Sequence, residues 1–217
     1  MAAPSTHSNQ WIYRGALFLG LVLWWVILPP FHIVPIERVR EDAATRAFDP
    51  EAFAEKFWTE ALPDRIESAV DIGSLIAMLD VDRESAANQF GHRLGLSGKS
   101  AYFVSGTGWI QDIQGSKVLI ALSEGGPVSV QISSGPTFGN AVRDGSGLLN
   151  VSDFGNSQDF NAISSEINRR IEERVLPELK GRAAQGMKIH FVGGVEVSDL
   201  TGPYLPLKIV PVRLSFP

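Results

Sequence analysis

The polar residues best suited to contact a ligand lie in one stretch of the chain, residues 133–168. Neutral amides, an adjacent arginine–aspartate pair and several phenylalanines follow one another there. Amides and carboxylates form hydrogen bonds with hydroxyl groups, and an aromatic ring covers the apolar face of a sugar ring. The stretch therefore predicts a site for a small carbohydrate, with the candidate residues Asn140, Arg143, Asp144, Asp153, Phe154, Asn156, Asn161 and Asn168.

The same residue types also have an ordinary structural role. Asparagine, aspartate, glycine and serine are common in turns and at helix caps. On this second interpretation, Arg143 and Asp144 tie a long loop to the rest of the fold, and Ser157 or Asp159 caps the helix that follows. The sequence leaves both interpretations open.

Catalytic motifs are not evident in the sequence. No His-x-x-x-His or Cys-x-x-Cys spacing occurs, and there is no Gly-x-Ser-x-Gly turn or phosphate-binding glycine loop. The four histidines are far apart in the chain, at positions His7, His32, His92 and His190. We therefore expect a non-enzymatic protein that uses no metal and no cofactor.

The candidate residues must be positioned by the elements around them, and these follow a recognisable order. Strands are predicted over residues 101–110, 117–122, 128–132, 187–197 and 205–216. An amphipathic helix over residues 158–176 separates the third strand from the fourth, and Pro177 marks its end. The order favours an α+β fold with a five-stranded OB-like barrel over residues 98–217. An open antiparallel sheet with one helix on a face is the alternative.

A small helical subdomain is predicted before the barrel, over residues 49–97. Asp49 and Pro50 have the residue types of a helix N-cap and first helical position. Asp71 and Asp82 are predicted to cap two further helices. Residues 37–48 are polar and form a predicted spacer.

Residues 1–36 contain a single charged side chain, Arg14, and are predicted to form a short tail and a membrane anchor. Residues 11–28 approach the length of about 20 residues that crosses a bilayer. We expect this helix to hold the main domain in the periplasm, attached to the inner membrane. A cleaved signal peptide is the alternative, but residues 29–32 lack a small-x-small cleavage site.

The charge balance bears on possible partners. The net charge of −5 disfavours non-specific binding to nucleic acid, so no nucleic-acid partner is expected.

Three segments, in order, resemble a known family. They are FHIVPIE at 31–37, FDPEAFAEKFW at 48–58 and SSGPTFGNAVRD at 133–144. The chain resembles the domain of unknown function 2291 family of predicted periplasmic lipoproteins. The resemblance implies an OB-like barrel with a helical subdomain, and an accessory role beside a ribose-type sugar ABC transporter or its binding protein. Family members usually carry a lipidated cysteine where Phe31 stands here, so the apolar helix would replace the lipid.

The alternative function is an adaptor module that docks on an envelope protein and has no small ligand.

Overall fold

The computed structural model describes residues 10–27, 48–93, 98–198 and 202–217. The chain divides into two units, residues 1–47 and residues 48–217. In the first unit, α1 (Gln10–Ile27) confirms that the predicted anchor region is helical, and Tyr13, Leu17 and Phe18 on it are exposed. Over the described ranges, no helix combines the length and the apolar character that crossing a membrane requires. The tail 1–9 and the whole segment 28–47, which includes all of the predicted spacer 37–48 except residue 48, lie outside the described residues.

The second unit begins with five short helical segments. Asp49 accepts a hydrogen bond from the Ala52 amide (3.0 Å), and Asp71 accepts one from the Ser74 amide (2.8 Å). Asp82, at the third predicted helix start, accepts hydrogen bonds from the amides of Glu84 and Ser85. All three predicted caps are therefore confirmed. The segments are α3 (Pro50–Lys56), the π-helical turn η1 (Phe57–Ala61), α4 (Leu62–Glu67), α5 (Ile72–Val81) and α6 (Arg83–Phe90).

Five strands then form a closed barrel, as predicted. They are β2 (Lys99–Gln114), β3 (Lys117–Ala121), β4 (Val128–Ser133), β5 (Lys188–Ser198) and β6 (Leu207–Ser215). The pairing runs β2–β3–β4–β6–β5 and returns to β2, with β4 and β6 parallel and the other barrel pairs antiparallel. A sixth strand that was not predicted, β1 (Val70–Asp71), pairs parallel with β2.

The long strand β2 closes the barrel because it pairs with two neighbours. Residues 99–109 pair with β5, and residues 109–114 pair with β3. Two glycines allow close packing along it. A Cβ on Gly106 would lie 2.5 Å from Ile72 Cγ2, and one on Gly108 would lie 2.5 Å from the Ala121 carbonyl oxygen. Any larger side chain at these positions would push the packed elements apart.

Three α-helices and the short 3-10 helix η2 (Val151–Asp153) connect β4 to β5, and two of the α-helices were not predicted. The predicted helix is present as α8 (Ser157–Arg174), with Phe160, Ile163, Ile167 and Ile171 buried. α8 ends at Arg174, two residues before the predicted end, but Pro177 is followed by more helix than was predicted. It stands in the first turn of α9 (Leu176–Arg182), where its missing amide hydrogen is tolerated. Residues Ala141–Ser146, which lie in the long loop considered for Arg143 and Asp144 in the sequence analysis, form α7.

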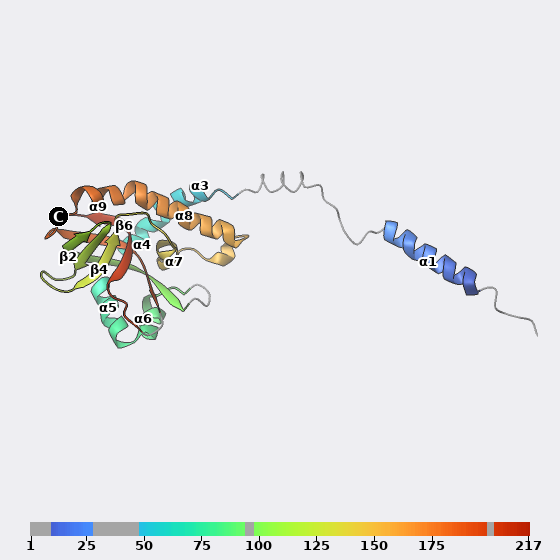
Figure 1. Cartoon of the computed structure of the whole chain (residues 1–217), viewed down its shortest axis with the longest axis horizontal. Coiled ribbons are helices and arrows are strands. Elements are labelled where there is room, and N and C mark those ends of the chain that lie inside the picture. Colours follow the sequence, from blue (N-terminus) through green and yellow to red (C-terminus); the bar gives the residue numbers. More distant parts are fainter. Residues whose placement is uncertain (1–9, 28–47, 94–97, 199–201) are drawn as a thin grey trace, which may run out of the picture. The chain divides into compact units, whose positions relative to one another are not determined.

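The helices cover the barrel on two sides. α8 and α9 lie along one side of the sheet, and α5 and α6 lie on the other (Figure 1). The buried side chains of the early helices and of the barrel belong to the same hydrophobic core.

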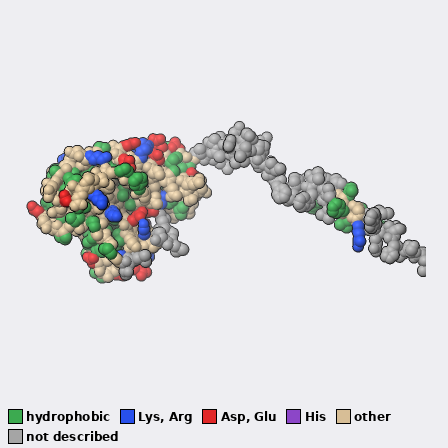
Figure 2. Space-filling view, viewed as in Figure 1, with side chains coloured by type: hydrophobic (Ala, Val, Ile, Leu, Met, Phe, Trp, Pro, Cys, Tyr) green, Lys and Arg blue, Asp and Glu red, His purple; other side chains and the backbone are tan. Residues whose placement is uncertain are grey.

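An ion-pair network joins α8 to α3. The buried Arg170 donates to the Glu55 carboxylate (2.9 Å) and to the Glu51 carbonyl oxygen (2.7 Å). Arg174 also binds Glu55, and hydrogen bonds from Arg174 and then Arg170 lower the pKa of Glu55. Figure 2 shows acidic and basic side chains next to one another over these helices. The network fixes the position of α8. Because α8 contacts α7, the network also supports α7.

Candidate functional site

The helix α7 is held against the barrel by direct backbone contact. A Cβ on Gly145 would lie 2.5 Å from the Tyr102 carbonyl oxygen of β2, and one on Gly194 of β5 would lie 2.3 Å from the Ala141 carbonyl oxygen. Gly147 follows α7 with a φ of +66°, in the left-handed conformation that suits glycine. The side chains of α7 therefore extend from a rigid position.

Arg143 is the best-connected side chain of α7. Its Nε donates to Asp144 Oδ1 (2.6 Å), and its Nη1 donates to the Phe160 carbonyl oxygen (3.0 Å) and to Asn161 Oδ1 (3.1 Å). The guanidinium carbon also lies 3.7 Å from the centre of the Phe160 ring. Because Arg143 is 4% exposed, these contacts fix it firmly. They also hold the Asp144 carboxylate in place.

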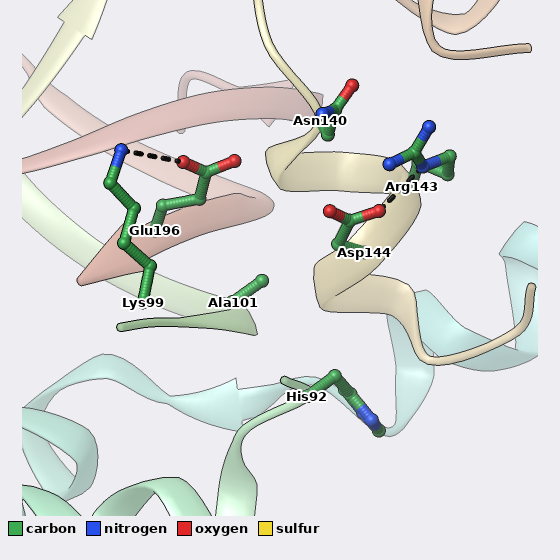
Figure 3. Close-up of a pocket in the computed structure, with 7 residues that line it drawn as sticks. All are labelled: His92, Lys99, Ala101, Asn140, Arg143, Asp144 and Glu196. Carbon is green, nitrogen blue, oxygen red and sulfur yellow. Dashed lines mark hydrogen bonds and ion pairs between the residues drawn. The ribbon is translucent and has the colours of Figure 1, made fainter. Parts of the chain in front are cut away.

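A hollow of about 300 Å³, which we name the central hollow, opens beside α7. Its lining combines side chains from α7, β2, β5 and the segment after α6 (Figure 3), namely His92, Lys99, Ala101, Asn140, Arg143, Asp144 and Glu196. Asp144 and Glu196 lie on facing walls, and Lys99 Nζ pairs with Glu196 Oε2 at 3.8 Å. Each wall thus carries one cation and one carboxylate, so the hollow offers both donors and acceptors.

His92 forms a third part of the wall and is held by the elements around it. Its backbone pairs with that of Ala101, and its ring fills the space beside Gly147. Burial lowers the pKa of His92, and the positive charge of Arg65 lowers it further, so the ring is neutral at neutral pH. A neutral imidazole offers one hydrogen-bond donor and one acceptor. Among the described residues, no three His, Asp or Glu side chains are grouped as metal ligands would be.

The structure brings together some of the predicted site residues. Asn140, Arg143 and Asp144 line the central hollow, and Asn161 binds Arg143. Asp153 borders a neighbouring hollow of about 320 Å³ that shares His92 and Asp144 with the first.

The other three predicted residues make structural contacts. Phe154 packs against the rings of Phe48, Phe53 and Phe160. Asn168 donates to the Gly139 carbonyl oxygen (2.9 Å). Asn156 is the N-cap of α8 and accepts from the Asp159 amide (2.8 Å), so the predicted caps Ser157 and Asp159 were wrong. The cap lies one residue earlier because the extended Asn156 precedes the first helical turn.

Three polar lining residues, His92, Lys99 and Glu196, were not predicted from the sequence. They are distant from the 133–168 stretch in the chain, and the antiparallel pairing of β2 with β5 places them beside it. In this pairing Ala101 lies opposite Glu196, and His92 pairs with Ala101. The only local signal was the position of Lys99 and Glu196 near the ends of predicted strands.

The closed barrel, with a helical connection between its third and fourth strands, belongs to the OB-fold class. The chain is similar to an OB-fold protein from Thermotoga maritima, whose crystal structure matches with a TM-score of 0.69 and 26% sequence identity. The match covers 79% of this chain and 99% of that chain.

The chain belongs to the DUF2291 family of predicted periplasmic lipoproteins, whose sequence profile matches residues 21–215. The predicted family is therefore confirmed, and its description, predicted periplasmic lipoprotein, gives a cellular location but no function. Comparison with curated proteins gives no match. The descriptions of the family and of the crystal structure name no ligand, reaction or transport partner.

Proposed function

We propose that this protein is a non-enzymatic binding protein of the cell envelope and that its ligand is polyhydroxylated, a sugar or a polyol. The observation that carries the proposal is the central hollow, where the pairs Arg143–Asp144 and Lys99–Glu196 occupy facing walls. Its volume of about 300 Å³ lies at the lower end of the range for small-molecule sites, roughly 300–1,000 Å³.

The chemistry of the walls suits hydroxyl groups better than a charged ligand. Ionised carboxylates accept hydrogen bonds from hydroxyls, whereas ammonium and amide groups donate to them. Since each wall carries charges of both signs, a ligand with a net charge would be repelled by one partner of each pair. A neutral ligand with many hydroxyls can use both partners.

The same pairing supports binding rather than catalysis. Each of the two carboxylates has its own cation, at 2.6 Å for Asp144 and 3.8 Å for Glu196. The lining of the central hollow includes no serine, threonine or cysteine, and its lysine and two carboxylates are engaged in the two pairs.

Calorimetric titration of the full chain, in mild detergent, against pentoses, hexoses and polyols tests this proposal. We expect saturable binding of at least one of them, and we expect Glu196→Gln to weaken it about tenfold, because a charged acceptor is lost. Glu124→Gln is the matched control, since Glu124 lies in an exposed turn and lines none of the hollows described.

If the folded protein binds none of these compounds, the proposal fails and the adaptor alternative gains support. The predicted association with a sugar ABC transporter is a separate hypothesis. Co-purification after cross-linking in cells would test it.

We also propose that α1 attaches the protein to the membrane in place of a lipid. These 217 residues contain no cysteine. Five large apolar side chains of α1 are at least 65% exposed, and contact with lipid would cover them: Tyr13, Leu17, Phe18, Leu19 and Trp24. We expect the chain to stay with the membrane fraction, at full length, whether or not signal peptidase is inhibited. A shortened, soluble product in untreated cells would contradict this attachment.

A further inference from the structure

We propose that the ligand is a linear chain of several sugar units, which lies along a groove through the central hollow. This inference rests on the proposed function and extends it from one sugar to an oligosaccharide.

The central hollow adjoins three others. The Asp153 hollow, of about 320 Å³, shares His92 and Asp144 with it. The Phe138 hollow, of about 350 Å³, shares Lys99 and Glu196 with it on the other side. A Tyr204 hollow, of about 240 Å³, shares Glu196, Ser198 and Lys208 with the Phe138 hollow. Shared residues therefore connect the four hollows, with the Asp153 hollow on one side of the centre and the Phe138 and Tyr204 hollows, which both reach Glu196, on the other. A single sugar would occupy only part of this groove.

The lining changes in character along the groove. The centre carries the two charged pairs, whereas the next two hollows carry aromatic rings. Phe138 is 81% exposed, so its ring is accessible to the apolar face of a sugar unit. Tyr204 is held by Arg83, which lies 5.1 Å from the centre of its ring, and by a hydrogen bond to Asp80. Aromatic rings beside hydroxyl-binding groups suit successive sugar units, each of which has one apolar face and a polar rim.

Two other linear polymers fit the groove less well. An extended peptide binds many proteins by adding a strand to a free sheet edge. Here β2 and β5 pair with each other over residues 99–109 and 188–198, and β5 also pairs with β6, so the strands that line the groove offer no such edge there. A nucleic acid would bring its phosphates close to the carboxylates of Asp144, Asp153 and Glu196 as well as to the cations of the lining, and the net charge of the whole chain, −5, would repel it. A neutral glycan meets neither obstacle.

Calorimetry on the full chain with two size series tests the inference. The probes are the monomer, trimer and hexamer of glucose and of N-acetylglucosamine. In at least one series we expect affinity to rise at least tenfold from monomer to hexamer. We expect Phe138→Ala to weaken hexamer binding about tenfold and to leave monomer binding unchanged, because the ring lies outside the central hollow. Val81→Ala is the control, since Val81 is 86% exposed and lines none of the four hollows.

The outcomes separate this inference from the proposed function. Affinity that does not depend on length, or hexamer binding that survives Phe138→Ala, overturns the oligosaccharide groove but leaves a single-sugar site in place. Absence of binding by every monomer and oligomer overturns the oligosaccharide groove, and the proposed function fails as well only if the pentoses, other hexoses and polyols also do not bind.

Discussion

The Gly145→Ala variant is expected to lose about 3 kcal/mol of unfolding free energy, at the upper end of what overpacking costs. The added Cβ would lie 2.5 Å from the carbonyl oxygen and 2.9 Å from the carbonyl carbon of Tyr102. Both atoms belong to the backbone of β2, so no side chain can rotate away. Relief requires α7 to move off the barrel, which would also displace Arg143 and Asp144 from the central hollow. Urea denaturation followed by circular dichroism measures the loss.

Gly181→Ala is the matched control for this variant. Gly181 lies in α9, and a Cβ there would have no atom within 4 Å. Alanine should therefore leave stability unchanged or raise it by up to about 1 kcal/mol, because it reduces the freedom of the unfolded chain. Equal stability of the two variants would show that α7 does not rest on β2 as described.

Arg143→Met should be still more damaging, with an expected loss of about 3–5 kcal/mol. Methionine replaces much of the buried volume but none of the donors. The Asp144 carboxylate, which is only 13% exposed, would lose its cation, and Asn161 would lose a donor to its side-chain oxygen. The removal of one partner from a buried pair leaves an uncompensated charge, which is the main cost.

An exposed arginine on α8 provides the comparison. Arg169 is 41% exposed and pairs with Glu51, Glu166 and Glu173. We expect Arg169→Met to cost no more than about 1 kcal/mol, as exposed ion pairs do. If Arg143→Met proved as mild as Arg169→Met in the same denaturation experiment, Arg143 would not be the support of the site.

Much of the fold could be predicted because its signals are local. The three aspartate caps bind amides two or three residues away, and the strands show their alternation within a few residues. The helix α7 could not be predicted in this way. Its six residues include a glycine and depend on contacts with Tyr102 and Gly194, which are distant in the sequence. Tertiary contact overrides weak helix propensity there.

The candidate site was predictable only on one wall. Arg143, Asp144 and Asn140 stood out because polar residues cluster near them in the sequence. Lys99 and Glu196 each look like an ordinary exposed residue near the end of a strand, and only the pairing of β2 with β5 brings them together. The clustering also misled, since Asn156 and Asn168 belong to a helix cap and a loop contact.

The central claim is that a polyhydroxylated ligand binds in the hollow beside α7. Chemical-shift perturbation on the isotope-labelled full chain, titrated with the best sugar from calorimetry, tests it most directly. We expect the largest shifts on His92, Lys99, Glu196 and residues 140–147, and we expect Glu196→Gln to weaken them at a given sugar concentration. Shifts confined to β3 and β4, or no shifts at saturating sugar, would contradict it.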